Sequence, residues 1–362
     1  DNAGTAVTTG SDNVFLGQNA GMAHVDGDSN VAVGKDVFKT NTTGQLNVAI
    51  GEVAMGLSTG SPLQNVAVGA NSLNHCAGNG ASAEAFSNTA VGHSSGSALT
   101  TGKMNTLLGA LAGKLLTTNS SYNVAVGDLA LGASAAAVDG VVAVGQSALT
   151  VNTANLNTGV GYNAGQATTS GDDNTYVGSQ AGYTNITGAD NVYCGDNAGY
   201  YLLGSNNTAL GSQAMSTVGE AAYQNTTALG YGVVTTASNQ VRLGNASVST
   251  FHCQVALTVD SDKRIKKNVK GIGGGLDFVN ALRPVSYKKI NPYNWPDELK
   301  ADCFKGIGPD GETAKKPTDD LTTYSGFIAQ EVKVAADAHG MTEWDGWSQG
   351  GNGMESLTAT AM

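Results

Sequence analysis

Asn30-Val31-Ala32-Val33-Gly34 is the stretch that decides the fold, because copies of it recur along two thirds of the 362-residue chain. The fourteen closing glycines lie on average about 17.5 residues apart. That period is too short for a helical repeat or a propeller blade, and it is typical of one coil of a β-solenoid. Other clear copies begin at Asn47, Asn65, Asn88, Asn105, Asn123, Asn157, Asn174, Asn191 and Asn207, and degenerate ones end at Gly17, Gly145, Gly230 and Gly244.

Each residue type of the unit has its own part in the predicted coil. Alternation along the short β-forming run sends Val31 and Val33 to one face of the strand and the small Ala32 to the other. Gly34 supplies a backbone conformation that a side chain would forbid at the corner, and asparagines stacked on successive coils can form a ladder. We therefore expect a mainly β chain whose residues 1–245 form a parallel β-solenoid of about 14 coils.

The expected interior of a coil is thin, because the unit is built from Ala, Val and Gly and aromatic residues make up 6% of the chain. We therefore expect three chains to pack around a common axis, burying their small-residue faces and covering exposed edges. The polar segments 40–44, 168–171 and 184–188 are predicted to be outer loops. Residues 74–84, within the longest interval between glycines, are predicted to be a surface loop, which is where a solenoid can also add a binding feature.

The repeat resembles the heads of trimeric autotransporter adhesins and the Asn-Thr-Ala-(Val/Ile)-Gly arrays of bacteriophage and viral tail fibres. This resemblance covers roughly two thirds of the chain. It implies a left-handed, homotrimeric β-roll that presents surface loops to a host cell-surface receptor, either a glycan or a protein. The resemblance is specific for architecture and does not identify the ligand, because such heads bind very different targets.

Charge and hydropathy exclude several classes of partner. Residues 1–245 hold 14 acidic and five basic side chains, a charge of −9, while residues 246–362 hold 15 and 13, a charge of −2. An acidic surface argues against nucleic acid or an anionic membrane as a partner. No apolar run approaches the ~20 residues needed to cross a bilayer, so we expect no membrane insertion.

No cofactor, metal or disulfide is indicated by the sequence. The four cysteines, Cys76, Cys194, Cys253 and Cys303, form no C-x-x-C pair and are expected to be reduced. No His/Cys cluster has zinc spacing, and the calcium-binding nonapeptide pattern is absent. Asp26, Asp28 and the Asp172-Asp173 pair are interpreted as solvated turn residues, although carboxylates that meet between coils or chains would be invisible in one sequence.

The composition changes after residue 245, since residues 246–362 hold all three tryptophans and five of the six prolines. Residues 246–260 are predicted to be a β connector. Apolar spacing then predicts a helix at 276–282, a strand at 285–290, a polar insert at 291–320, a strand at 324–330 and a helix at 331–338. Residues 261–362 are therefore expected to form a small α+β domain.

Ser261 and Lys266 are the one hydroxyl and amine whose spacing suggests chemistry. A bend or the start of a helix would bring Nζ near Oγ, and a partly desolvated lysine can act as the base for a serine. The alternative for residues 263–267 is a solvated basic run. His252 is interpreted as an ordinary strand residue and not as a third catalytic group.

Three motifs in order, Ser261-Asp262-x-Arg264-x-Lys266, Leu282-Arg283-Pro284-Val285-Ser286-Tyr287 and Gly326-Phe327-Ile328-Ala329-Gln330-Glu331-Val332, resemble the intramolecular chaperone auto-processing domain. That domain ends phage endosialidases, tail spikes and L-shaped tail fibres, and it occurs in a eukaryotic membrane-bound transcription factor. The resemblance implies a domain that holds three chains in register while the upstream β-structure folds, and then cuts itself free. Its terminal trimerising helix is expected to be missing here.

On this resemblance, Ser261 is the nucleophile and Lys266 its general base, while Asp262, Arg264 and Asn268 have positioning roles. The predicted protein is a homotrimeric bacteriophage tail fibre or spike that contacts a host receptor and other virion tail proteins. It would be extracellular in the virion and assembled in the host cytoplasm. The alternatives are a bacterial trimeric surface adhesin and a glycan-degrading tail spike.

Overall fold

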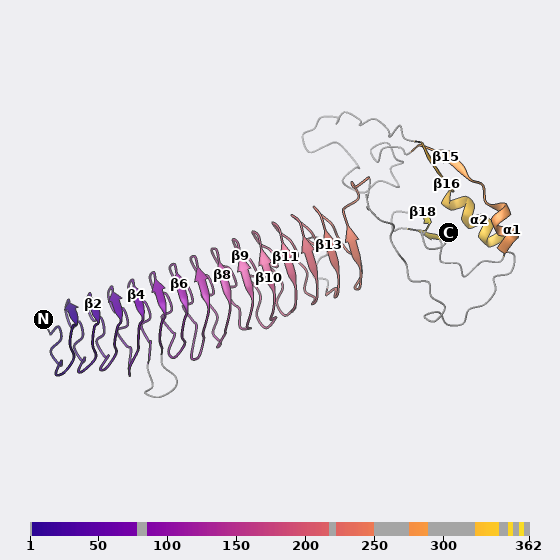
Figure 1. Cartoon of the computed structure of the whole chain (residues 1–362). Helices are drawn as coiled ribbons and strands as arrows, with labels where there is room; N and C mark the ends of the chain where they lie inside the picture. Colours follow the sequence, from indigo (N-terminus) through magenta and orange to yellow (C-terminus); the bar gives the residue numbers. More distant parts are fainter. Residues whose placement is uncertain are drawn as a thin grey trace, which may run out of the picture. The chain divides into compact units, whose positions relative to one another are not determined.

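The computed structural model describes residues 2–77, 85–216, 222–249, 275–288 and 323–339, together with the backbone of two short strands, Trp347–Gln349 and Glu355–Leu357. The chain divides into two compact units, Asp1–Asn245 and Ala246–Met362. The first is a β-solenoid and the second contains both helices and strands (Figure 1). The fold class expected from the repeat, a mainly β chain with a parallel solenoid and a small α+β region, is confirmed.

Each coil of the solenoid contributes one three-residue strand, and fourteen strands pair in chain order in a single sheet. All pairings are parallel, and the register repeats without a slip: Val31 pairs with Val48, and Val48 pairs with Val66. The strands are β1 (Val14–Leu16), β2 (Val31–Val33), β3 (Val48–Ile50), β4 (Val66–Val68), β5 (Thr89–Val91), β6 (Thr106–Leu108), β7 (Val124–Val126), β8 (Val142–Val144), β9 (Thr158–Val160), β10 (Thr175–Val177), β11 (Val192–Cys194), β12 (Thr208–Leu210), β13 (Thr227–Leu229) and β14 (Val241–Leu243).

Glycine closes each coil because the next coil leaves no room for a side chain at the corner. Gly178 has a φ of +134°, and an added Cβ would lie 2.4 Å from the carbonyl oxygen of Gly195. Side chains rarely adopt that backbone conformation, and the contact would be far inside van der Waals distance. The close approach of successive corners is thus what makes glycine obligatory, as the repeat predicts.

The predicted asparagine ladder is present inside the corner that precedes most strands; Val141, Thr226 and Gln240 take the asparagine position before β8, β13 and β14. The backbone N–H and the side-chain amide of Asn47 both donate to Oδ1 of Asn30, at 3.1 Å each, and the same amide donates to the carbonyl of Pro62 at 2.8 Å. Val141 interrupts the ladder, but its backbone N–H still donates to Oδ1 of Asn123 at 3.0 Å. The ladder therefore satisfies buried polar groups and joins each coil to its neighbours.

In β2 to β13 the middle residue of the strand points into its own coil, whereas the first and third residues point outward; in β14 all three residues are exposed. Ala32 and Ala49 are fully buried, and Val31 and Val33 are partly exposed. The expectation that three chains bury their small-residue faces against one another is therefore wrong. The small side chains already fill the inside of their own coil, and the face left for a partner carries the larger β-branched and leucine side chains.

The coil interior is also fuller than the repeat suggests, because a large residue often lies at the fourth position after the closing glycine. Leu131 and Leu149 occupy that position in coils whose strands have Ala at the middle, and both are fully buried. Where the strand instead carries a large residue, that fourth position is glycine: Gly182 would place a Cβ 2.4 Å from the ring of Tyr176. Large and small side chains thus alternate between two positions, which keeps the packing dense.

The predicted outer loops do turn, but each also directs one polar side chain inward. Asn41, Thr168 and Asn185 are fully buried. The Asn185 amide donates to the Tyr176 hydroxyl at 2.7 Å and to the Gly188 carbonyl at 3.1 Å. The prediction of wholly external loops is therefore only partly correct. In the predicted insertion loop, residues 78–84 lie outside the described residues.

The second unit contains α1 (Gly275–Ala281), β15 (Val285–Tyr287), β16 (Tyr324–Gly326), α2 (Ala329–Ala338), β17 (Trp347–Gln349) and β18 (Glu355–Leu357). The predicted helices and strands are present, with shorter strands than expected. The second helix starts at Ala329 because Ile328 is still extended, with a φ of −86° and a ψ of 122°. The β15–β16 pair and the β17–β18 pair are both antiparallel. Residues 250–274 and 289–322 lie outside the described residues.

Candidate functional site

The residues predicted to carry the self-cleavage chemistry fall outside the part of the chain that the structure describes. These are Ser261, Asp262, Arg264, Lys266 and Asn268, and the same holds for His252. Their proposed roles therefore remain predictions. The structure does describe the two downstream motifs of the same domain.

Those two motifs, which the sequence separates by almost forty residues, come together in the second unit. Strands β15 and β16 pair so that Val285 lies opposite Gly326 and Tyr287 lies opposite Tyr324. The Arg283 guanidinium forms a two-pronged ion pair with Glu331, in which Nε donates to Oε2 at 3.1 Å and Nη2 donates to Oε1. The hydrogen bonds and negative charge of Glu331 raise the pKa of Arg283. Since both side chains are substantially exposed, the pair fixes geometry more than it adds stability.

The buried part of the second unit is small in the region that the structure describes. Phe278, Val332, Ala335 and Ala336 form its buried cluster, against which Leu282 and Phe327 pack. Other apolar side chains of the two helices are exposed, namely Leu276, Val279 and Val334. Exposed apolar residues on so small a unit are typical of a surface that packs against a partner.

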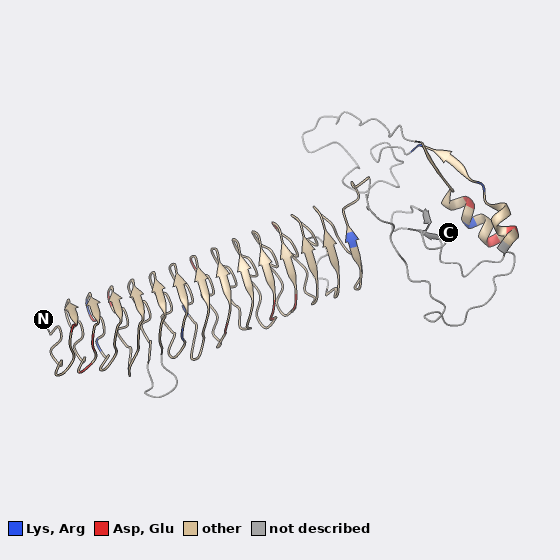
Figure 2. Ribbon diagram, in the orientation of Figure 1, with Lys and Arg blue, Asp and Glu red and all other residues tan. Residues whose placement is uncertain are grey.

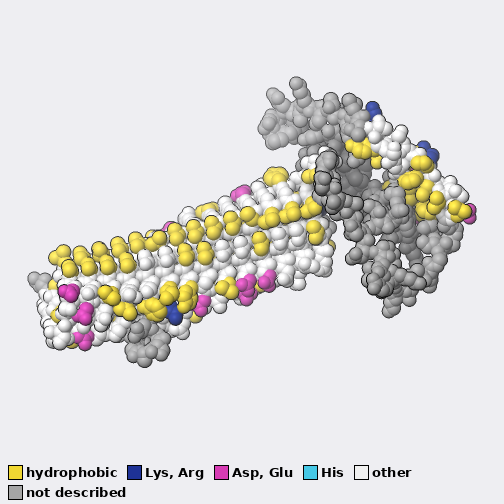
Figure 3. Space-filling model, in the orientation of Figure 1, with side chains coloured by type: hydrophobic (Ala, Val, Ile, Leu, Met, Phe, Trp, Pro, Cys, Tyr) yellow, Lys and Arg dark blue, Asp and Glu magenta, His cyan; other side chains and the backbone are white. Residues whose placement is uncertain are grey.

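A second candidate surface is the outward face of the solenoid sheet, which we call the strand face. Its first row holds eight valines and six threonines, the first residues of β1 to β14. Its second row, made of the third residues of the strands, is wholly apolar: Leu16, Val33, Ile50, Val68, Val91, Leu108, Val126, Val144, Val160, Val177, Cys194, Leu210, Leu229 and Leu243. Figure 3 shows continuous rows of hydrophobic side chains along the solenoid.

The strand face carries no charge in either row. Figure 2 shows the strands without charged side chains except the last, and that exception is Arg242, the middle residue of β14. An uncharged, apolar band that runs the whole length of a sheet is costly to leave in water. The length and composition of the strand face fit a partner surface that is equally long, regular, uncharged and apolar.

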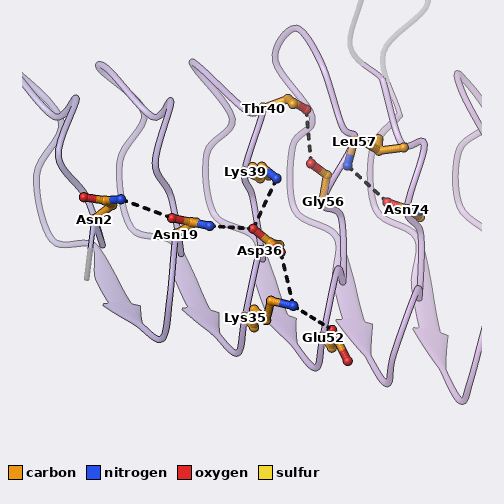
Figure 4. Close-up of polar contacts among 10 residues, drawn as sticks. All are labelled: Asn2, Asn19, Lys35, Asp36, Lys39, Thr40, Glu52, Gly56, Leu57 and Asn74. Atoms are coloured by element: carbon orange, nitrogen blue, oxygen red, sulfur yellow. Dashed lines mark hydrogen bonds and ion pairs between the residues drawn. The ribbon is translucent and has the colours of Figure 1, made fainter.

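The first coils carry a polar ladder on a different set of positions, two residues after the closing glycine (Figure 4). The Asn19 amide donates to Oδ1 of Asp36 at 2.8 Å, and Lys39 lies 3.3 Å from the same carboxylate. The hydrogen bond from Asn19 and then the charge of Lys39 lower the pKa of Asp36. Lys35 pairs with Glu52 of the next coil at 3.4 Å. These contacts tie coils together and place no nucleophile beside a base.

Neither the acidic pairs nor the cysteines of the described residues form a reactive site. Asp26, Asp172 and Asp173 are exposed, as expected of turn residues. Cys76 and Cys194 are both free, and burial raises the pKa of the Cys76 thiol to about 12. Within the described ranges, no group of three or more His, Cys, Asp or Glu side chains could hold a metal ion.

The fold and these surfaces together define a protein built on a repetitive β-solenoid, which is followed in sequence by a small α+β unit. Residues 261–341 match the family described as the chaperone of endosialidase. Among curated proteins, none matches the chain. A β-solenoid followed by a segment of this family fits a tail-spike-like structural protein with a C-terminal chaperone domain, and such domains imply trimer formation. None of the helices that the structure describes is long and apolar enough to span a membrane.

Sequence reasoning identified the motifs but missed two features of these surfaces. It did not pair Arg283 with Glu331, although opposite charges within two motifs of one domain are a signal that could have suggested it. It also assigned the partner-facing role to the small residues of the repeat. The absence of charge from all outward strand positions is the sequence signal that points to the strand face instead.

Proposed function

We propose that the chain is one subunit of a homotrimeric bacteriophage tail fibre or tail spike that attaches the virion to its host. The observation that carries this proposal is the uncharged, apolar strand face, which continues over all fourteen strands and is followed in sequence by the chaperone match. Three copies packed through this face would remove one apolar band per chain from water. Virion tail proteins and a host cell-surface receptor are the remaining partners.

The C-terminal domain would gather three chains before their solenoids form. Parallel pairing between long chains is non-local, so association is entropically costly until the chains are held together. The exposed Leu276, Val279 and Val334 offer apolar contacts for this step. Residues 246–260 would connect this domain to the shaft.

Self-cleavage would then make assembly irreversible. The Ser261 hydroxyl attacks the carbonyl carbon of a peptide bond at or next to itself, and Lys266 accepts the hydroxyl proton and passes it to the departing amine. Water then hydrolyses the resulting ester. Asp262, Arg264 and Asn268 position these groups. Loss of the clamp leaves a shaft that unfolds slowly because its three chains are interlocked.

The strand-face interface is tested by mass and by the reactivity of Cys194, which lies in the second row between Val177 and Leu210. Light scattering of the uncut Ser261→Ala protein should give three times the 36.5 kDa chain mass. Maleimide should label Cys194 only after dissociation in denaturant, whereas Cys76, buried inside its own coil, reacts only when the solenoid unfolds. A monomer with a reactive Cys194 under native conditions would refute the interface.

Charge placed on the strand face provides the matched comparison. Val144→Lys introduces a cation into the second row and should abolish the trimer, while Gln146→Lys, on an exposed turn two residues later, should leave it intact.

Self-cleavage is separately tested by denaturing electrophoresis. Wild type should yield a fragment of about 260 residues, and Ser261→Ala and Lys266→Met should remain whole. An uncut wild type would remove the proteolytic step and leave the trimer proposal standing.

A further inference from the structure

A cluster of tyrosines on the solenoid surface lines an open recess of about 300 Å³, which we call the tyrosine recess. Its lining residues are Asn197, Tyr200, Tyr201, Gln213 and Ser216. They belong to the turns that follow the closing glycines Gly195 and Gly211, and none of them lies on the strand face. The recess is therefore a feature separate from the proposed trimer contact.

The aromatic rings of this cluster are stacked across neighbouring coils. The ring centroids of Tyr183 and Tyr200 lie 4.9 Å apart with planes 20° from parallel, and Tyr201 meets Tyr200 edge-on at 4.4 Å. Partial burial, with the neighbouring Tyr201 and Tyr183, raises the pKa of Tyr200. Tyr201 remains 43% exposed at the surface of the recess. A stacked and partly uncovered aromatic platform is suited to flat ligands with apolar faces.

This platform departs from the repeat that builds the rest of the solenoid. Tyr183 and Tyr200 are the fifth residues after their closing glycines. The residues at that position in the nine preceding coils are not aromatic: Met22, Lys39, Gly56, Asn74, Ser97, Lys114, Gly132, Thr150 and Gln166. The two tyrosines are thus not required by the coil, and an exposed aromatic cluster placed on a regular scaffold is typical of a binding site.

Hydrogen bonds between coils hold the recess in place before any ligand binds. The Thr184 hydroxyl donates to the Tyr200 carbonyl at 2.6 Å, and the backbone N–H of Gln213 donates to the Asp196 carbonyl at 2.7 Å. The Asn197 amide donates to the Asp196 carboxylate at 2.8 Å. Amide and hydroxyl groups fixed beside aromatic rings can bind a ligand rich in hydroxyls without a large entropic cost.

The charge around the recess decides between classes of ligand. No lysine or arginine occurs from residue 115 to residue 241, whereas seven acidic residues do: Asp128, Asp139, Asp172, Asp173, Asp190, Asp196 and Glu220. An anionic ligand, such as a sialylated, sulfated or phosphorylated glycan, would meet no lysine or arginine of these coils and would lie beside the Asp196 carboxylate, which accepts a hydrogen bond from Asn197. The local field therefore selects against anions.

We propose that the tyrosine recess binds a sugar unit of a neutral glycan. The C–H face of a pyranose ring lies against Tyr200 and Tyr201, and its hydroxyls exchange hydrogen bonds with Asn197, Gln213 and Ser216. This proposal rests on the attachment role given above, because it names the chemical class of the receptor. It does not depend on the self-cleavage step.

The test is binding of the full chain to a printed array of neutral and anionic glycans, followed by saturation-transfer NMR with the soluble forms of the glycans that bind. Wild type should bind neutral glycans and not sialylated or sulfated ones. Tyr201→Ala should weaken binding about tenfold, and Gln213→Ala should weaken it several-fold. Tyr162→Ala is the matched control, since Tyr162 is also exposed on the solenoid but does not line the recess; the binding of this variant should be unchanged.

Circular dichroism and light scattering of the same samples separate this proposal from the proposed function. Three results for a folded trimer overturn the glycan proposal and leave the fibre assignment standing. The first is that the wild type binds no neutral glycan, the second that it binds only anionic glycans, and the third that the Tyr201→Ala variant binds as well as the wild type. Specific, tyrosine-dependent binding by a folded monomer supports the recess and overturns the trimeric fibre. Retained binding in both Tyr201→Ala and Gln213→Ala excludes the recess even if one of the variants repacks.

Discussion

The two units of the chain bury their apolar side chains in opposite ways. In the solenoid, one continuous buried cluster extends from Ala32 to Val233, because the same contacts repeat between every pair of coils. In the described part of the second unit, the buried cluster consists of four residues, and comparable side chains such as Val334 are exposed. The solenoid interior is thus completed within one chain, whereas the described part of the second unit leaves apolar side chains of both helices uncovered.

The largest expected effect comes from a methyl group placed at a coil corner. Gly178→Ala would hold a residue with a side chain at the strained φ of +134°, and its Cβ would lie 2.4 Å from the Gly195 carbonyl oxygen. We expect a loss of about 3–5 kcal/mol, measured as a shift of the urea midpoint. Gly326→Ala is the control in the second unit: its nearest neighbour would be Cε1 of Tyr287 at 3.6 Å, an ordinary contact. Equal effects of the two changes would show that corner spacing does not limit the solenoid.

The sequence predicts the solenoid well because its physical constraints repeat. The corner glycine, the asparagine ladder and the alternation of Val31, Ala32 and Val33 each recur, so a single pattern carries the argument many times. The filling of the interior could not be predicted in the same way. Leu131 has a φ of +53°, a conformation that leucine rarely adopts, and nothing in the local sequence indicates that it turns inward.

The second expected effect tests how large and small residues share the coil interior. Tyr176→Ala removes a fully buried ring and should cost about 3–5 kcal/mol, and Gly182→Leu should cost a similar amount because its Cβ would meet that ring at 2.4 Å. The double variant reproduces the pairing of Ala143 with Leu149 two coils earlier. It should therefore recover about 1–3 kcal/mol relative to the sum of the single changes. Simple additivity in a denaturant-based double-mutant cycle would contradict this packing rule.

The candidate cleavage site was predicted from the spacing of Ser261 and Lys266 and from motif resemblance, and neither of these determines its geometry. A serine–lysine dyad depends on the distance and desolvation of two side chains, neither of which a linear spacing of five residues determines. The two downstream motifs differ from the dyad because strand pairing brings them together. The antiparallel β15–β16 pair contains residues of both motifs, and the Arg283–Glu331 contact follows from that pairing. Strand pairing can be anticipated from pattern, whereas catalytic geometry cannot.

A smaller effect separates stability from assembly in the second unit. Val332→Ala removes apolar volume from the buried cluster and should cost about 2 kcal/mol of folding stability. Val334→Ala makes the same change on the exposed side of α2; in the uncut Ser261→Ala protein it should leave folding nearly unchanged but raise the protein concentration at which trimers dissociate. Thermal unfolding and sedimentation velocity measure the two properties. If Val334→Ala lowers the melting temperature as much as Val332→Ala and leaves assembly untouched, the exposed helix face is not a contact surface.

The smallest expected effect is the acid response of the first coils, where Asp28 caps Ser11 of the preceding coil. The carboxylate accepts hydrogen bonds from the Ser11 backbone N–H at 2.7 Å and from its hydroxyl at 3.0 Å. These bonds lower the pKa of Asp28 below its usual value of 3.8. Because the folded form then holds its proton less tightly than the unfolded form, the contribution to stability is fully present above pH 3.8. It is lost as the pH falls through the lower, folded-state value.

The measurement is the melting temperature of wild type and Asp28→Asn between pH 5 and pH 2. Wild type should be more stable than the variant above pH 3.8, and the difference should shrink below that value because the protonated carboxyl and the amide then present similar acceptors to Ser11. Other carboxylates titrate in both proteins and cancel in the comparison. A difference that grows as the pH falls would mean that Asp28 is destabilised by its site, which is the opposite of what its two short hydrogen bonds require.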